Sequence, residues 1–262
     1  MQCLDEHVIP GEFNMVKYKL YTKAHNEKIL KTVDNDGGQF TAEEHAYVIE
    51  KEFKKYYKNK DALLGWYLPE AASSFVPLRW LIQHIKENGF KNIISMGAGN
   101  CVHEYILKCA LPEECNVTAT DFDSFYIEKS KSFFLSINSI TFDFFKDDIS
   151  MLNSNFDLAV FFGSAYVMND EQFIHLFKQL KENNVKQIID FHAGYIPYEH
   201  VPKYFVGNVL RKLNLLTNYR GKFHGYVRTK DELRYLYKET GAKSVVEKSI
   251  YPYKYVAICN FK

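Results

Sequence analysis

The chain has 262 residues, of which 47% are hydrophobic and 16% are aromatic, and it carries 33 basic against 32 acidic side chains. This length allows one large domain or two small ones, and the apolar content excludes a disordered or low-complexity chain. A net charge of +1 argues against a protein that binds nucleic acid by neutralising phosphates, since such proteins usually carry a strong basic excess.

The first 20 residues include Asp5, Glu6, Glu12 and Lys17 and contain no apolar run of the signal-peptide type. The most apolar stretch, 158–168, is far shorter than the roughly 20 residues that cross a bilayer. The five cysteines are odd in number and form no Cys-x-x-Cys pair, which disfavours a disulfide framework or a zinc site. We therefore expect a cytoplasmic protein with reduced thiols, no membrane partner and no metal.

Residues 1–90 are predicted to form a helical N-terminal cap. Thr41 and Glu44 have the spacing of a capping box, and the helix that they begin is predicted to extend to about residue 58. Two further helices are predicted at 63–72 and 76–88, the second ending at Gly89.

Short apolar runs alternate with amphipathic ones from residue 91 onward. This alternation predicts right-handed βαβ units and a parallel sheet with helices on both faces. Strands are predicted at 92–96, 117–120, 139–145, 156–162 and 186–190, and helices up to residue 110, over 124–135 and over 171–182.

The end of the chain predicts one strand of opposite direction. Thr229 and Glu232 form a second capping-box pattern, which begins a helix that ends at Gly241. The last two strands, 243–250 and 254–261, are joined by so short a turn that they must be antiparallel. The expected fold is α/β: a doubly wound, mostly parallel, seven-stranded sheet over residues 91–262, with one antiparallel strand.

A glycine-rich turn is the sharpest functional signal. The strand 92–96 leads into Gly97, Ala98 and Gly99 and then into a helix. Glycines at this spacing let the backbone approach a ligand closely, and a helix N-terminus offers unpaired N–H groups. Asp121 ends the next strand, 24 residues after Gly97, where an acid can accept hydrogen bonds from ribose hydroxyls. The pattern predicts a nucleotide-like ligand; a tight turn without a ligand is the alternative.

The pattern resembles that of the class I S-adenosylmethionine-dependent methyltransferases rather than the dinucleotide fingerprint, which has a third glycine where Val102 stands. The glycine turn is similar to the first motif of this family. Asp121 matches the acid of the second motif, and Phe122 matches its apolar neighbour, which lies against adenine. The third motif matches Asp147, Asp148 and Ile149, whose acid reaches the adenine amino group.

The resemblance covers about residues 76–191 and 229–262 and implies S-adenosylmethionine as the cofactor. Phe162 and Gly163, at the end of the fourth strand, complete the residues expected to contact it. The family usually has an acid where Ser95 stands, and this acid helps to orient the methionine end of the cofactor. Glu104 or a residue of the N-terminal segment is a candidate substitute. The family often has a third glycine where this chain has Cys101.

Methyl transfer requires that an attacking oxygen or nitrogen be aligned with the S–CH3 bond, and it requires a base where that nucleophile carries a proton. Ligands of this fold lie outside the carboxyl ends of the strands. His192, just after the fifth strand, is the candidate base, because an imidazole titrates near neutrality. Asp190 and Tyr195 are the other predicted catalytic residues. A histidine that only hydrogen-bonds at the sheet edge is the alternative.

The segment 192–228 interrupts the regular alternation and is predicted to be an inserted substrate-recognition segment. Its six basic residues and one acid give it a net charge of +5, so the remainder of the chain sums to −4. A basic, aromatic segment favours a small anionic acceptor, such as a phosphorylated or carboxylated molecule or a nucleotide-activated sugar. A solvated loop is the alternative. The predicted substrate contacts are Ser164, Tyr166, Tyr198, His200, Arg220 and His224.

Two other functions stay open at this point. An NAD-dependent oxidoreductase would use the same kind of glycine turn, but the third glycine of the dinucleotide fingerprint is absent. A non-catalytic subunit that binds the cofactor without turning it over is compatible with the departures at Ser95 and Cys101.

Overall fold

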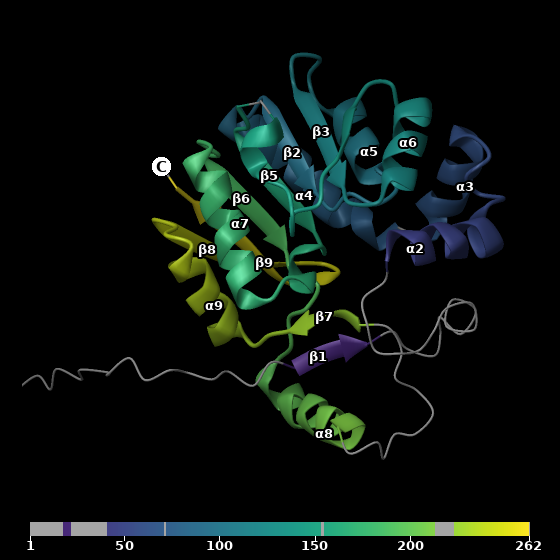
Figure 1. Ribbon diagram of the computed structural model, residues 1–262. Helices are drawn as coiled ribbons and strands as arrows, with labels where there is room; N and C mark the ends of the chain where they lie inside the picture. Colours follow the sequence, from purple (N-terminus) through teal and green to yellow (C-terminus); the bar gives the residue numbers. More distant parts are fainter. Residues whose placement is uncertain (1–17, 22–40, 71, 153–154, 213–222, 262) are drawn as a thin grey trace, which may run out of the picture.

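A seven-stranded sheet forms the centre of the protein (Figure 1). The computed structural model describes residues 18–21, 41–70, 72–152, 155–212 and 223–261. The strands follow the order β4-β3-β2-β5-β6-β9-β8, and β9 alone runs antiparallel to its neighbours β6 and β8, as predicted. Their bounds are β2 (Asn92–Met96), β3 (Asn116–Asp121), β4 (Asn138–Thr141), β5 (Leu158–Phe162), β6 (Gln187–Phe191), β8 (Ser244–Ile250) and β9 (Tyr253–Asn260).

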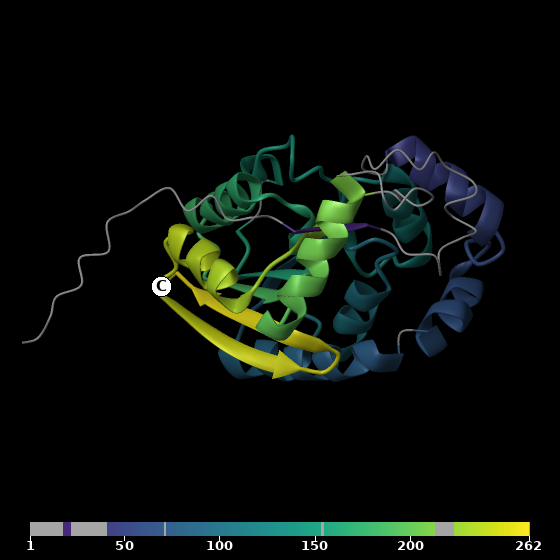
Figure 2. The same cartoon turned by 90° about the horizontal axis from the view of Figure 1, so that it is seen from below.

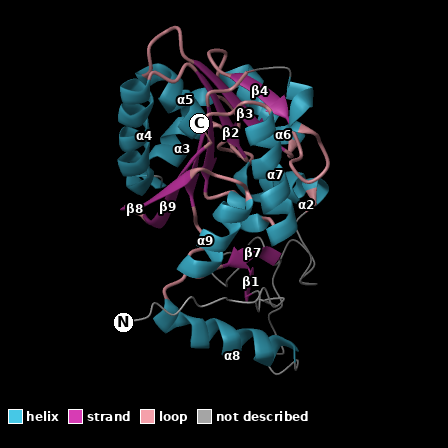
Figure 3. Cartoon of the chain, turned by 90° about the vertical axis from the view of Figure 1, so that its left-hand side faces the viewer, coloured by secondary structure: helices cyan, strands magenta, loops and turns pink. Residues whose placement is uncertain are grey.

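Helices cover both faces of this sheet, and Figure 3 shows α4 on one side of it with α7 and α9 on the other. The β5 strand shows why, because its side chains alternate between two separate apolar clusters: Val160 belongs to one and Phe161 to the other. The first cluster includes residues of α4 (Phe75–Asn88), α5 (Val102–Ala110) and α6 (Ser124–Phe133). The second includes residues of α7 (Asp170–Glu182) and α9 (Lys230–Glu239).

Local capping interactions set the beginnings of several helices. The capping box of Thr229 and Glu232 begins α9, as the sequence predicts. Asn169 and Gln172 form a further capping box at the start of α7. Gly89 adopts a left-handed conformation with φ of 66° and ends α4, also as predicted.

The described residues between 41 and 88 are mainly helical and pack on the first cluster. Thr41 and Glu44 exchange the two hydrogen bonds of a capping box. The single helix expected over 41–58 is instead α2 (Ala42–Val48), which continues as a π-helical turn over Ile49–Phe53. The following helix, α3 (Lys60–Glu70), contributes Leu63 to the cluster. The boundary of this cap at residue 90 stays a prediction.

A small second sheet lies near the carboxyl ends of β5 and β6. It pairs β1 (Tyr18–Tyr21) with β7 (Phe223–Val227) in antiparallel register. The helix α8 (Val201–Lys212) lies beside it, nearest the viewer in Figure 2. The segment 192–228, which interrupts the regular alternation of the sequence, contains a helix and a strand among its described residues. The strand β7 contacts the turn after β5, at the end of the sheet where ligands bind in α/β folds.

Candidate functional site

The glycine turn after β2 has the backbone that its sequence predicts. Gly97, Gly99 and Cys101 all have positive φ angles, of 72°, 55° and 59°. A Cβ atom at Gly97 would lie 2.7 Å from the Cβ of Ser164, so only glycine fits there. A Cβ atom at Gly99 would meet no atom within 4 Å, so the space beside this residue is open to a ligand. The backbone N–H of Ala98 donates to the carbonyl of Thr120, which holds the turn against β3.

Asp121 joins the end of β3 to this turn. Its side chain accepts hydrogen bonds from the backbone N–H groups of Gly99 at 2.8 Å and Asp123 at 3.0 Å. The residue is buried, with 6% exposure. The structure thus joins Gly99 and Asp121, residues of two predicted motifs, by a direct hydrogen bond.

The other predicted adenine contacts lie in different surroundings. Phe122 exposes 37% of its surface next to Asp121. Asp147 accepts from the backbone N–H of Asp143 at 2.8 Å, and this contact forms a turn just beyond Thr141, where β4 ends earlier than predicted.

Asp148 and Ile149 follow in the chain. Asp148 accepts from the backbone N–H of Ser150 and from Gln179 of α7, and its side chain is exposed. Ile149 is buried in the second cluster. Of the two neighbouring acids, Asp147 is the one whose carboxylate contacts the turn that follows β4.

Ser95 and Glu104 form a buried polar pair beneath the glycine turn. The Oγ of Ser95 donates to Oε1 of Glu104 at 2.6 Å, and both residues are 1% exposed. Burial raises the pKa of Glu104 to about 7, although the hydrogen bond from Ser95 opposes this shift. Ser95, which stands where an acid was expected, is therefore hydrogen-bonded to Glu104, an acid of α5.

The carboxyl end of β5 lies directly beside the glycine turn. Ser164 donates through Oγ to the carbonyl of Met96 at 2.5 Å. Gly163 donates its N–H to Phe191 of β6 at 3.0 Å, and the rings of Phe162 and Phe191 stack at 4.8 Å. Phe162 also lies 5.0 Å from the ring of His103 of α5. Ser164, which follows β5, therefore lies beside Gly97 of the glycine turn.

The predicted catalytic pair lies at the end of β6 and is fully buried. Oδ2 of Asp190 accepts from Nδ1 of His192 at 2.9 Å and from the hydroxyl of Tyr237 at 2.6 Å. Among the described residues, Asp190 Oδ1 and His192 Nε2 have no hydrogen-bond partner. Tyr195 does not join this pair but stacks on Tyr255 at 5.4 Å. Tyr237, on α9, is a contact that the sequence reasoning missed, because its spacing is that of an apolar helix face.

Tyr166 and His224 come together at the contact between the turn after β5 and β7. Their rings meet edge to face at 5.6 Å. Tyr166 is 8% exposed, and burial raises the pKa of its hydroxyl above the ordinary value. Gly194 and Gly225 lie so close to Tyr166 that an added Cβ would come within 2.8 Å and 2.3 Å of its side-chain atoms.

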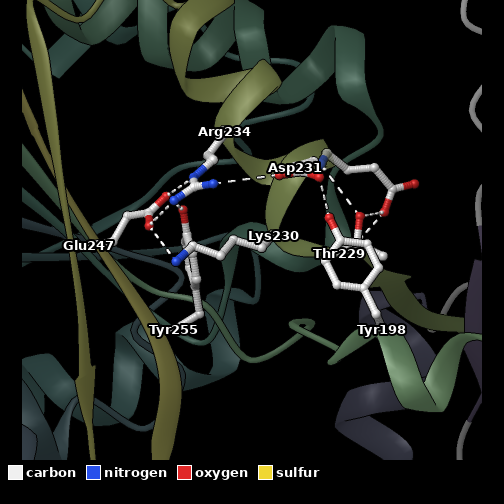
Figure 4. Close-up of polar contacts among 8 residues, drawn as sticks. Tyr198, Thr229, Lys230, Asp231, Arg234, Glu247 and Tyr255 are labelled. Carbon is white, nitrogen blue, oxygen red and sulfur yellow. Dashed lines mark hydrogen bonds and ion pairs between the residues drawn. The ribbon is translucent and has the colours of Figure 1, made fainter.

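The remaining predicted substrate residues do not gather at this contact. Figure 4 shows the hydroxyl of Tyr198 bonded to Asp231 in the first turn of α9. His200 is exposed before α8, and Arg220 lies outside the described residues. The same figure shows Glu247 of β8 bonded to Arg234, Lys230 and Tyr255, a network that joins α9 to the sheet.

Aromatic residues of the described N-terminal helices contact residues that follow the glycine turn and Asp121. The hydroxyl of Tyr67 lies 3.2 Å from Nε2 of His103. Burial lowers the pKa of His103 to about 4, so this imidazole is neutral at neutral pH. Tyr57 contacts the ring of Phe125 at 5.4 Å, just after the Asp121 segment. Trp66 stacks on Tyr56 at 4.6 Å, further from the turn.

The described part of the chain contains no group of three or more His, Cys, Asp or Glu residues that could hold a metal ion. Within the same residues, no helix is both long and apolar enough to cross a membrane.

The fold of this chain is similar to those of several solved methyltransferase structures. Human N-acetylserotonin methyltransferase matches with a TM-score of 0.55 and 18% identity, over 90% of this chain and 65% of that one. SibL, an S-adenosylmethionine-dependent methyltransferase, has a TM-score of 0.53 and 15% identity, over 74% and 57%. An O-methyltransferase family protein from Burkholderia thailandensis has a TM-score of 0.52 and 11% identity, over 81% and 62%.

The chain therefore has the Rossmann-like fold of the S-adenosylmethionine-dependent methyltransferases. It spans between 57% and 65% of the length of the three proteins compared. No protein-family model matches it, and no curated protein sequence matches it.

Proposed function

We propose that this protein is an enzyme that transfers a methyl group from S-adenosylmethionine to an oxygen or nitrogen atom of a small anionic molecule. The observation that carries the proposal is the hydrogen bond from the N–H of Gly99 to Asp121. It joins a glycine turn and an acid at the ends of two adjacent parallel strands, within a methyltransferase fold.

The residues at this turn fit an adenosyl group. The backbone at Gly99 borders open space, which allows the close approach that a nucleoside needs. Asp121 supplies a carboxylate, the kind of acceptor that ribose hydroxyls need, at the end of β3, and the exposed ring of Phe122 offers a stacking surface for adenine. Asp147 is the acid that we assign to the adenine amino group. Among the described residues, the buried Oε2 of Glu104 below the turn has no hydrogen-bond donor, which supports a ligand group at this position.

S-adenosylmethionine supplies a methyl group that its sulfonium already activates, so the chain has to position the acceptor and receive its proton. Because Asp190 is a hydrogen-bond acceptor, the proton of a neutral His192 lies on Nδ1, and Nε2 carries the lone pair. We assign proton acceptance to this Nε2 atom. His192 is only 1% exposed, and its Nε2 atom lies close to Gly194, which also borders Tyr166. The molecule that receives the methyl group therefore reaches Nε2 only when the segment of Gly194 and Tyr166 moves.

The charge of the segment 192–228 supports an anionic acceptor. Its net charge is +5, and it supplies β7 and α8 near the carboxyl ends of β5 and β6. Attraction between this segment and an anion would favour acceptor binding. The described cysteines form no disulfide, which supports the expected cytoplasmic location.

Calorimetric titration with S-adenosylmethionine, S-adenosylhomocysteine and NAD tests the cofactor. We expect the two sulfur ligands to bind and NAD to give no heat. Binding of NAD alone would overturn the proposal. Turnover is then followed as release of S-adenosylhomocysteine with pools of phosphorylated, carboxylated and nucleotide-sugar acceptors. Binding without product in every pool would favour a non-catalytic subunit.

The Asp121→Asn variant tests the site itself. We expect it to weaken S-adenosylmethionine binding by about 10- to 100-fold, the usual effect of losing a charged hydrogen-bond partner. The Asp61→Asn variant, which alters an exposed acid at the start of α3, is the matched control and should bind like the wild type. Unchanged affinity in Asp121→Asn would mean that the ribose contact is misassigned.

A further inference from the structure

Glu104 is a buried acid, and only one of its two carboxylate oxygens has a hydrogen-bond partner among the described residues. It lies in the first turn of α5 with 1% exposure, and Oε1 accepts from Ser95 at 2.6 Å. Its other oxygen, Oε2, has no hydrogen-bond partner among the described residues. A buried acceptor without a donor costs free energy, so native proteins rarely keep one without a reason.

The surroundings of Glu104 disfavour its charged form. Burial raises its pKa to about 7, and the negative charge of Asp121 on β3 adds to this effect. Tyr67 of α3 and Cys101, just before α5, also lie within electrostatic range, and burial raises the pKa of each, so both are neutral at neutral pH. A cationic donor at Oε2 would satisfy the oxygen and stabilise the charge together.

The position of this carboxylate relates it to the glycine turn. Ser95 precedes Gly97 by two residues on β2, and Glu104 follows Gly99 by five residues on α5. The hydrogen bond between them therefore closes the loop that contains the turn.

We propose that Oε2 of Glu104 binds the α-ammonium group of S-adenosylmethionine, with Ser95 holding the carboxylate in place. This inference rests on the proposed function, since it needs the adenosyl group at the glycine turn. The ammonium group is a cation with three donors, which is the chemistry that Oε2 lacks. The pair would thereby distinguish ligands that keep the amino acid end from ligands that do not.

The test compares two ligands on the Glu104→Gln variant. S-adenosylhomocysteine carries the ammonium group, whereas 5′-methylthioadenosine lacks the whole amino acid end. We expect the variant to bind S-adenosylhomocysteine about 10- to 100-fold more weakly and 5′-methylthioadenosine within about 2-fold of the wild type. The Glu113→Gln variant, an exposed glutamate beyond α5, is the control and should match the wild type for both ligands. Equal losses for both ligands would show a merely structural role and overturn the inference.

A measurement on the wild type covers the case in which Glu104→Gln does not fold. At about pH 6 a group with a pKa near 7 is mostly protonated, so binding of the ammonium group should release about one proton. Calorimetry in buffers of different ionisation enthalpy measures this number. No release with S-adenosylhomocysteine, or equal release with 5′-methylthioadenosine, would overturn the inference. If neither ligand binds the wild type, the proposed function fails first, and the two failures stay distinguishable.

Discussion

Tyr237 is a third member of the buried hydrogen-bonded group of His192 and Asp190. One oxygen of Asp190 accepts from both His192 and Tyr237, so the carboxylate is fixed between two donors. We expect His192→Ala to lower turnover by about 10²- to 10⁴-fold, the usual contribution of a general base, and to leave the affinity for S-adenosylmethionine unchanged. Steady-state kinetics together with calorimetry measures both quantities.

The matched variant for this prediction is Tyr237→Phe, which keeps the ring and removes one donor to Asp190. It should lower turnover less than His192→Ala and shift the pH profile of the reaction. If His192→Ala retains normal turnover, the imidazole is only a hydrogen-bonded part of the sheet edge.

Single residues differ in how well the sequence predicts them. A short local pattern predicts the turn at Gly97 and Gly99 and the acid Asp121 at the end of β3, and the structure joins Gly99 and Asp121 by a hydrogen bond. The sequence also offers Glu104 as a candidate acid, but not its contact with Ser95. Tyr237 could not be predicted, because it contacts a residue 47 positions away across the packing of α9 on the sheet.

The elements show the same division between local and long-range interactions. The main strands and helices follow from apolar runs and capping boxes, which depend on neighbours in the chain. The β1–β7 pair joins segments roughly 200 residues apart, and such long-range pairing leaves no local signal.

Gly225 of β7 gives a prediction at the level of this small sheet. Its φ is 153°, and an added Cβ would lie 2.3 Å from the ring of the buried Tyr166. We expect Gly225→Ala to lower the free energy of unfolding by about 1–3 kcal/mol, through backbone strain and overpacking. Urea denaturation measures this change.

The control is Gly207→Ala in α8, where an added Cβ would meet no atom within 4 Å. This variant should raise the free energy of unfolding by up to about 1 kcal/mol, because alanine favours a helix. Equal stability of the two variants would show that Tyr166 does not restrict β7.

The contact of α9 with β8 predicts how stability depends on pH. Burial would raise the pKa of Glu247, but hydrogen bonds from Arg234, Lys230 and Tyr255 outweigh it and lower the pKa to about 2. An acid with a lowered folded-state pKa contributes stability above its unfolded value of 4.5, and the contribution is lost as the pH falls toward 2. Glu247→Gln should therefore destabilise the protein more at about pH 7 than at about pH 3.5, as measured by urea denaturation. An equal effect at both pH values would contradict the lowered pKa.

The whole molecule is held together by one sheet that both apolar clusters share. The strands β2, β5, β6 and β9 each supply side chains to both clusters, so neither layer of helices keeps its apolar face covered without the other. The two tryptophans report on different parts: Trp66 lies on α3 and Trp80 on α4, and both pack against the first cluster. Cooperative unfolding of the described N-terminal helices with the sheet follows from this packing.

Ligand binding should therefore stabilise the molecule as a unit. A ligand that binds only the folded state at about 100 times its Kd adds about 2.7 kcal/mol, which for a chain of this size raises the Tm by about 5–10 °C. We expect this shift with S-adenosylhomocysteine and none with NAD. The fluorescence of Trp66, followed in a Trp80→Phe variant, should change at the same temperature as the far-ultraviolet circular dichroism. If Trp66 reports an earlier transition that the ligand does not move, the N-terminal cap unfolds separately, and its contacts near the glycine turn contribute nothing to cofactor binding.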